Sequence, residues 1–244
     1  MKIHFQSSMR YVLCALCMAI AVPAGAAEAV ARVTHLSGLM TVKGADGAVR
    51  SLSVRSDVMQ GDVLTTYKDA YARLKFMDDA EVVMRPESQL VVSSYSYDAA
   101  RPQGDSAALS MLKGGLRAVS GLIGKRNKEA VTYTTPTATI GIRGTHFGAL
   151  FCQDNCGGVP TASGRPPENG LHVDVTDGVI VVRNNAGTQS FNAGQFGYVS
   201  SPAAPPVVVP PNRGVQVTMP SAISQNQGTG RGVANTSDNQ CVAQ

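Results

Sequence analysis

Short runs of alternating apolar and polar residues, separated by turn residues, recur along most of the chain. The clearest run is 70–77, in which Ala70, Ala72, Leu74 and Phe76 fall on one face and polar or exposed positions fall on the other. A period of two predicts a strand with one buried side. Runs of this kind return at roughly ten-residue spacing with turn chemistry between them, which is typical of an all-β fold.

The same pattern predicts further elements. Strands are expected at 31–42, 49–54, 63–64, 82–84, 90–92, 116–122, 137–143, 171–176, 179–183, 189–191 and 196–199, with a short helical turn at 107–111 and loops at 96–108, 121–128 and 152–169. The stretches Gly44–Gly47 and Asp177–Gly178 predict hairpin turns, and Asn184–Gly187 predicts another turn.

Similar short patterns recur after several turns, for example at 38–42, 115–119 and 178–182. Such recurrence predicts short strands coiled into a β-solenoid or prism-like stack. Because the period is irregular, a β-sandwich of antiparallel strands is the alternative.

The segment 131–151 is rich in threonine and β-branched residues. Ala138, Ile140 and Ile142 share one face of it, which predicts a half-buried strand. Gly144 interrupts the alternation and predicts a bulge or bend. Arg143 comes just before that bend, so we expect its guanidinium to donate hydrogen bonds to backbone carbonyls there.

The first 27 of the 244 residues have the features of a secretory signal peptide. Lys2 and Arg10 form a basic region, residues 11–22 form an apolar one, and residues 24–27 are small. No later run is apolar enough to span a membrane, so we expect a periplasmic or secreted protein with no transmembrane segment after cleavage. The chain then divides into a signal peptide (1–27), an all-β domain (28–200) and a tail (201–244).

The tail is rich in Pro, then in Gly, Ser, Asn and Gln. A segment of this composition buries too little apolar surface to offset its ordering entropy, so we predict that it is mostly extended or disordered. Val207–Val209 and Val215–Val217 are candidate strands that could dock on an exposed sheet edge.

The charge of the chain argues against nucleic-acid binding. The formal net charge is +4, and loss of Lys2 and Arg10 leaves +2. A local basic set consists of Lys113, Arg117, Lys125, Arg126 and Lys128. We interpret it as a solvated loop, with a patch for an anionic wall polymer as the alternative.

Three cysteines remain after removal of Cys14 and Cys17 with the signal peptide. Cys152 and Cys156 flank a turn-forming spacer and are candidates for a disulfide, although Cys241 could pair with either of them. A metal site using His146 or His172 would lack a second close ligand pair, so no metal site and no cofactor are expected.

No catalytic residue is predicted. His146 with Asp154 is the best enzymatic candidate, for a periplasmic hydrolase, but no nucleophile motif accompanies it. Asp78 and Asp79 are interpreted as turn residues, and Asp62 and Thr65 as caps of local backbone. We therefore expect a protein that is not an enzyme.

Four segments in order resemble motifs of the FecR periplasmic domain family. They are Gly61–Thr66, which contains Gly61, Asp62 and Thr65; Ala72–Asp79, which contains Asp78; Leu112–Arg117; and Thr135–Phe147, which contains Arg143, Gly144 and Thr145. The resemblance covers about residues 33–150 and is not clear beyond Phe151.

The resemblance implies a periplasmic all-β domain that relays signals, as from an outer-membrane transporter to a sigma factor. Signalling members carry an anti-sigma segment and a transmembrane helix before this domain. Because a cleavable signal is expected here instead, we interpret the chain as a stand-alone exported member that binds or senses an envelope protein or a cell-wall glycan. The contact surface would be an exposed sheet edge or the 152–169 loop. A structural cell-wall protein is the alternative.

Overall fold

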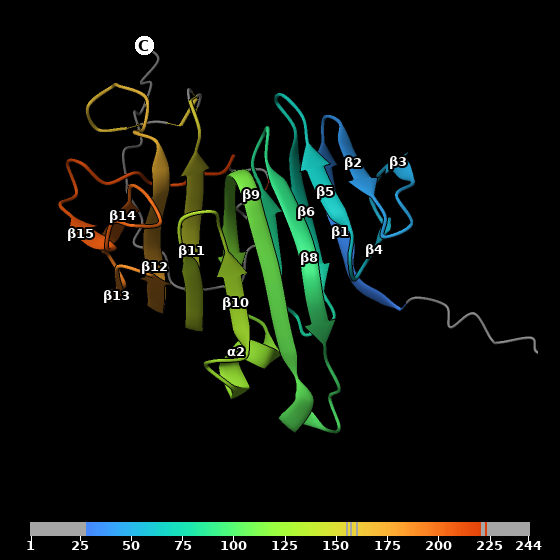
Figure 1. Cartoon of the computed structure of the whole chain (residues 1–244). Coiled ribbons are helices and arrows are strands. Elements are labelled where there is room, and N and C mark those ends of the chain that lie inside the picture. The colour runs from blue at the N-terminus through green and yellow to red at the C-terminus, as the bar shows by residue number, and fades with distance from the viewer. Residues whose placement is uncertain (1–27, 155, 157, 160, 221–222, 224–244) are drawn as a thin grey trace, which may run out of the picture.

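The computed structural model describes residues 28–220, except Asn155, Gly157 and Pro160, together with Ile223. The predicted signal peptide, Cys241 and most of the residues after Pro220 lie outside this part. Its strands are β1 (Ala29–Ser37), β2 (Met40–Lys43), β3 (Val49–Ser51), β4 (Asp57–Met59), β5 (Val63–Thr66), β6 (Tyr71–Phe76), β7 (Glu81–Met84), β8 (Gln89–Ser96), β9 (Ser106–Val119), β10 (Val131–Thr134), β11 (Thr139–Cys152), β12 (Gly170–Asn184), β13 (Gly187–Asn192), β14 (Phe196–Val199) and β15 (Val207–Val209). A 3₁₀ turn, η1 (Pro102–Gly104), and a short helix, α2 (Leu122–Arg126), complete the described elements (Figure 1).

The predicted all-β class is confirmed. All fifteen strands belong to one hydrogen-bonded sheet, and every described strand pair is antiparallel except β9 with β10. The pairings therefore do not confirm the finer prediction of stacked solenoid or prism coils. In the described part of the chain, no helix has the length and apolar character needed to cross a membrane.

Three long strands divide the sheet into two sections. The first section contains β3, β2, β5, β8, residues 106–113 of β9, β10, residues 139–143 of β11, residues 179–184 of β12, and β13. The second contains β4, β1, β6, β7, residues 114–119 of β9, residues 146–152 of β11, residues 170–175 of β12, β14 and β15. Strands β9, β11 and β12 each pass from one section to the other.

Each of these strands changes section at a glycine with positive φ: Gly114 (+78°), Gly144 (+62°) and Gly178 (+76°). Such a conformation is readily available only to glycine. At Gly178, an added Cβ would also lie 2.4 Å from the carbonyl oxygen of Gly144. The predicted bulge at Gly144 is confirmed by a register shift between Arg143 and His146.

The two sections enclose one hydrophobic core. Ala138, Ile140 and Ile142 of the first section are buried, as the alternation predicted, and the apolar face of β6 is buried from the second. The rings of Tyr133 and Phe147, one from each section, meet edge to face with centroids 5.3 Å apart. Burial of these side chains on a shared interior drives the sections together.

Three local predictions are wrong. Residues 107–111 form part of β9 and not a helical turn, because β8 and β10 pair with both sides of this segment. Leu122 begins helix α2, where a strand end and then a loop were predicted. Asp177–Gly178 is not a hairpin turn: β12 continues through it, and the glycine bends the strand.

The turns at Gly44–Gly47 and Asn184–Gly187 are confirmed as the connections of β2 with β3 and of β12 with β13. The prediction of a disordered tail from residue 201 is not confirmed for residues 201–220, which the structure describes. Val207–Val209 forms β15 on the edge of β14, as the docking prediction had it, and Val217 is fully buried.

Candidate functional site

Residues of the Gly61–Thr66 motif make hydrogen bonds to nearby backbone groups. Gly61 has φ +86°, and the Asp62 carboxylate accepts a hydrogen bond of 2.8 Å from the backbone N–H of Met59. Thr65 Oγ1 lies 3.3 Å from the side-chain amide of Gln89, and within the described part of the chain no bond of this hydroxyl to the backbone is seen. The buried Thr66 caps backbone instead, by donating to the carbonyl of Arg85 at 2.6 Å and accepting from the N–H of Ser88 at 3.0 Å.

Asp78 joins three elements. It is buried, and its Oδ1 accepts hydrogen bonds from the Tyr95 hydroxyl (2.9 Å) and the Ala80 N–H (3.2 Å). Its Oδ2 accepts from the N–H of Ile123 in α2 at 3.2 Å. This carboxylate therefore fixes β8 and α2 to the turn that it shares with Asp79.

The bend of β11 is held by Thr145 and Ser120. The N–H of Thr145 donates to Ser120 Oγ at 2.8 Å, and its carbonyl accepts from the N–H of Ser120 at 2.9 Å. The expectation for Arg143 is wrong: its side chain is exposed, because it stands on the outer face of β11, away from the core. Among the described residues, no hydrogen bond of its guanidinium to a backbone carbonyl is seen.

Arg117 is the arginine that holds a buried backbone carbonyl, that of Val217. In the second section, Arg117 on β9 lies opposite Gly148 on β11, and Gly148 lies opposite Asp174 on β12. Arg117 Nη1 lies 3.0 Å from Asp174 Oδ1, and both side chains are buried. The two meet over Gly148, where a Cβ would lie 2.1 Å from Asp174 Oδ2.

This ion pair clamps the tail. Arg117 Nη1 donates to the carbonyl of Val217 at 2.8 Å, and Asp174 Oδ2 accepts from the N–H of the same residue at 2.9 Å. Arg85 donates to the carbonyl of Thr218 and, at 3.3 Å, to that of Gly158. Charged side chains of the sheet thereby satisfy both backbone groups of Val217. Hydrogen bonds to charged groups are stronger than those between neutral groups.

Burial shifts the pKa values of Asp174 and His146 in this cluster. Burial raises the pKa of Asp174, and the Arg117 guanidinium opposes the rise. Burial, and then the charge of Arg117, lower the pKa of His146 to about 4. The neutral ring of His146 accepts a hydrogen bond of 3.1 Å from Arg117 Nε, so this histidine supports the clamp.

The candidate catalytic pair is not brought together. His146 lies within β11, whereas Asp154 lies beyond the end of the strand and bonds to Asn169 at 2.7 Å. The six residue-to-residue steps of the strand from His146 to Cys152 alone span about 20 Å at roughly 3.3 Å per step.

The basic set of 113–128 is also divided. Arg117 is buried in the clamp, Arg126 lies 3.7 Å from the buried Asp105, and Lys113 is exposed beside the bend of β9. The set therefore does not form one patch.

The disulfide prediction is confirmed between Cys152 and Cys156, with their Cα atoms 5.6 Å apart. The bond closes a small ring at the start of the 153–169 loop, on the outer face of the second section. Beneath this loop, a second small core contains Leu150, Cys152, Val159, Val215 and Val217. The loop and the tail therefore cover the same face together, and Val215 pairs with Thr161 across them.

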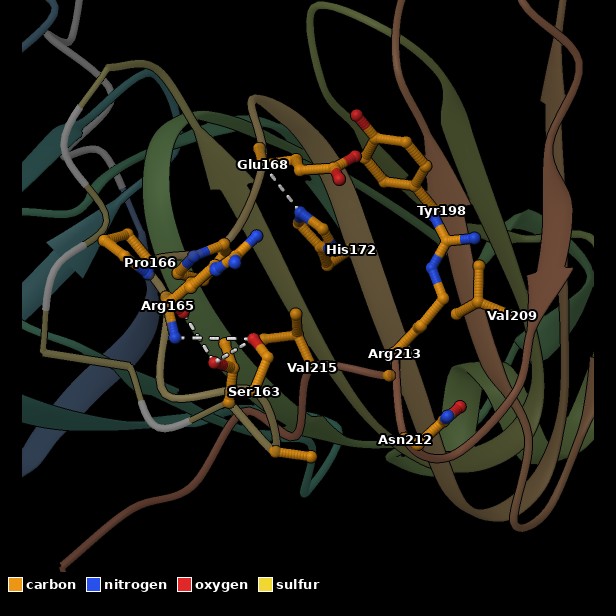
Figure 2. A pocket seen from close by; sticks show the side chains of 14 residues that line it. Ser163, Arg165, Pro166, Glu168, His172, Tyr198, Val209, Asn212, Arg213 and Val215 are labelled. Carbon is orange, nitrogen blue, oxygen red and sulfur yellow. Dashed lines mark hydrogen bonds between the residues drawn. The ribbon is translucent and has the colours of Figure 1, made fainter.

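A cavity of about 420 Å³ opens between the loop and the tail. It is lined by Thr161, Ala162, Ser163, Arg165, Pro166, Pro167, Glu168, His172, Tyr198, Val209, Asn212, Arg213, Gly214 and Val215. The rings of His172 and Tyr198 stack with centroids 4.8 Å apart, and Arg165 lies on the side of His172 while Arg213 lies on the side of Tyr198 (Figure 2).

Polar contacts fix the floor of this cavity. His172 Nε2 lies 2.8 Å from the carbonyl of Glu168, and the Tyr198 hydroxyl donates to the carbonyl of Asn169 at 2.6 Å. Burial lowers the pKa of His172. Burial raises the pKa of Tyr198, and the negative charge of Glu168 raises it further. The arrangement offers two exposed guanidiniums and one carboxylate around a fixed aromatic pair, which suits a polar ligand with an anionic group.

Sequence reasoning missed the clamp and the cavity. Asp174 and His172 alternate with buried valines of β12, which is the pattern of a strand with one solvated face. Only the fold reveals that the loop around Val159 and the tail at Val215 and Val217 cover that face. The small residue Gly148, opposite both Arg117 and Asp174 in register, was the one available signal.

The family model described as FecR protein matches residues 62–178. The chain carries a FecR domain. The match begins at Asp62 of the first motif and extends beyond Phe151 to Gly178, so it includes the clamp residues Arg117 and Asp174.

Solved structures give weaker similarities. Two crystal structures of a candidate anti-sigma factor from Parabacteroides distasonis ATCC 8503 are 11% identical to the FecR-domain chain, with TM-scores of 0.44 and 0.43. The alignments cover 60% of this chain and 58% of that one. A structure described as a cell surface anchoring domain is 26% identical over 25% of this chain and 82% of its own, with a TM-score of 0.25. A search of the curated proteins found no match.

Proposed function

We propose that this FecR-domain protein is an exported, non-enzymatic binding or sensing module that contacts an envelope protein or glycan. The observation that carries the proposal is the cavity of Figure 2, which the 153–169 loop and the clamped tail build on one face of the sheet. Ligand sites commonly combine a preformed hollow with a few fixed polar groups.

Binding accounts for the polar residues better than catalysis does. His146 accepts from Arg117, His172 is engaged with the carbonyl of Glu168, and Asp154 is engaged with Asn169. Each candidate acid or base thus has a structural partner. By contrast, Arg165 and Arg213 are exposed at the cavity and take part in no ion pair among the described residues.

An envelope location is supported by the FecR domain and by the disulfide. Disulfide bonds persist in the periplasm and outside the cell and are rare in the cytosol. The alternative of a structural cell-wall protein rested on the basic set of 113–128, of which Arg117 is buried in the clamp and Arg126 lies beside Asp105.

The proposal is tested by site-specific photo-crosslinking in the native envelope. A benzophenone amino acid replaces Pro166 or Val209 at the cavity, and in the control it replaces Val49, which is 65% exposed on β3. We expect one discrete crosslinked product from both cavity positions and none from Val49. The absence of a product from both cavity positions, or the same product from all three, would contradict the proposal.

A further inference from the structure

A second hollow crosses the outer face of the first section, on strands β10, β11 and β12. It encloses about 300 Å³. Its floor is Gly141, which pairs in register with Thr132 on one side and Val181 on the other. Nothing but the carbonyl of Val181, at 3.8 Å, lies within 4 Å of the place where a Cβ of Gly141 would be. The glycine therefore leaves an open trough in the sheet.

Three cationic side chains line this trough. Lys128 precedes β10, and Arg143 lies on β11. Arg183 lies on β12, opposite Thr139 of β11. All three are exposed, and none takes part in an ion pair among the described residues. Glu129 is the one acidic residue of the lining. Several cations around one hollow create a positive potential that attracts an anion.

We propose that this trough binds a polysaccharide that bears carboxylate groups. The guanidiniums of Arg143 and Arg183 match the geometry of carboxylates and can bind them through paired hydrogen bonds. The hydroxyls of Thr132 and Thr139 stand beside the glycine floor, where they can bond sugar hydroxyls. The hollow lies on the exposed outer face of the sheet, where a unit within a longer chain can reach it.

Other polyanions fit the lining less well. No aromatic side chain lines the trough, so a single-stranded nucleic acid would find no surface on which to stack its bases. An acidic peptide would also need partners for its backbone. The backbone groups of β11 are already paired with β10 and β12, and the trough lies on the face of the sheet and not at an edge.

The trough and the cavity of Figure 2 lie on opposite outer faces, since the two sections enclose the core between them. The glycan site is therefore separate from the proposed partner site, and either can fail without the other. A chain with both sites would hold its partner close to an anionic polymer.

Binding of oligogalacturonate to the purified chain at low salt tests the inference. We compare the wild type with Arg143→Gln/Arg183→Gln and with a control of equal charge loss, Lys43→Gln/Arg55→Gln, both exposed and outside the trough. We expect about tenfold weaker binding for the trough variant, because two charge-assisted contacts are lost, and a wild-type affinity for the control. Thermal unfolding checks that each variant is folded.

Two further ligands test whether binding requires both the carboxylate groups and the sugar. A neutral dextran of equal length should not bind. Equal binding of polyglutamate would overturn the inference in favour of an acidic peptide. It is also overturned if oligogalacturonate does not bind the wild type, or if both double variants weaken binding equally.

Discussion

Arg117 and Asp174 meet over the missing side chain of Gly148, with Nη1 and Oδ1 3.0 Å apart, and together hold both backbone groups of Val217. A buried ion pair of this kind costs desolvation energy, so it stabilises a fold only where further hydrogen bonds complete it. Here His146 and the tail supply those bonds. The clamp thus links the FecR domain to a segment that lies about forty residues beyond it.

Loss of one partner should be strongly destabilising. In Asp174→Ala, the Arg117 guanidinium stays buried without its counter-charge, which costs about 3–5 kcal/mol. Chemical denaturation of the wild type and the variant measures this difference in the free energy of unfolding. As a control, Asp98→Ala removes an exposed ion pair with Arg101 and should cost less than about 1 kcal/mol. Equal losses in the two variants would exclude a buried clamp.

The glycine between the pair should resist substitution. In Gly148→Ala, the new methyl group would lie 2.1 Å from Asp174 Oδ2 and 2.7 Å from Val217 Cβ. Overpacking of this kind typically costs about 1–3 kcal/mol. Gly104→Ala is the matched control, because no atom lies within 4 Å of its Cβ position. Melting temperatures of both variants, measured side by side, check the prediction; an unshifted Gly148→Ala would speak against the geometry.

The clamp should weaken in acid. The pKa of His146 is lowered from 6.5 to about 4 in the fold, so the unfolded chain binds the proton more readily. The contribution of His146 to stability is therefore complete above about pH 6.5 and is lost as the pH falls toward 4. Unfolding of wild type and His146→Gln at pH 7 and pH 4.5 gives the comparison. We expect a smaller loss in the variant, and identical losses would refute a role for His146.

Much of the fold could be predicted from the sequence, and the failures have physical reasons. The alternation of apolar and polar residues predicted strand β6 and the buried face of β11, because one side of each strand packs on the core. The same rule misled at Asp177–Gly178, where the glycine of a typical hairpin turn bends a continuous strand. A glycine's positive φ serves both purposes, and only the pairing of β11 with β12 distinguishes them.

The site was harder to predict for a related reason. A strand with one polar face indicates solvent, so Arg117 was interpreted as part of a solvated loop and Arg143 as the buried donor. The tail reverses these roles: it covers Arg117 and Asp174 and leaves Arg143 exposed. Coverage by a segment a hundred residues away leaves no local pattern, and the Pro-rich composition of that segment predicted disorder.

The two arginines should therefore differ sharply on substitution. Arg143→Ala should change the free energy of unfolding by less than about 0.5 kcal/mol, as is usual for an exposed side chain. Arg117→Ala should lose about 3–5 kcal/mol. Denaturation of both variants in parallel measures the contrast, and a larger loss for Arg143→Ala would restore the role that the sequence suggested.

Hydrogen exchange at the backbone amide of Val217, followed by nuclear magnetic resonance, tests the clamp most directly. The amide is buried and bonded to Asp174 Oδ2, so we predict slow exchange in the wild type and fast exchange in Asp174→Ala. The amide of Gly61, bonded to the carbonyl of Val92 in the first section, is the reference within each sample. Rapid exchange of Val217 in the wild type, while Gly61 remains protected, would contradict a tail held by the sheet.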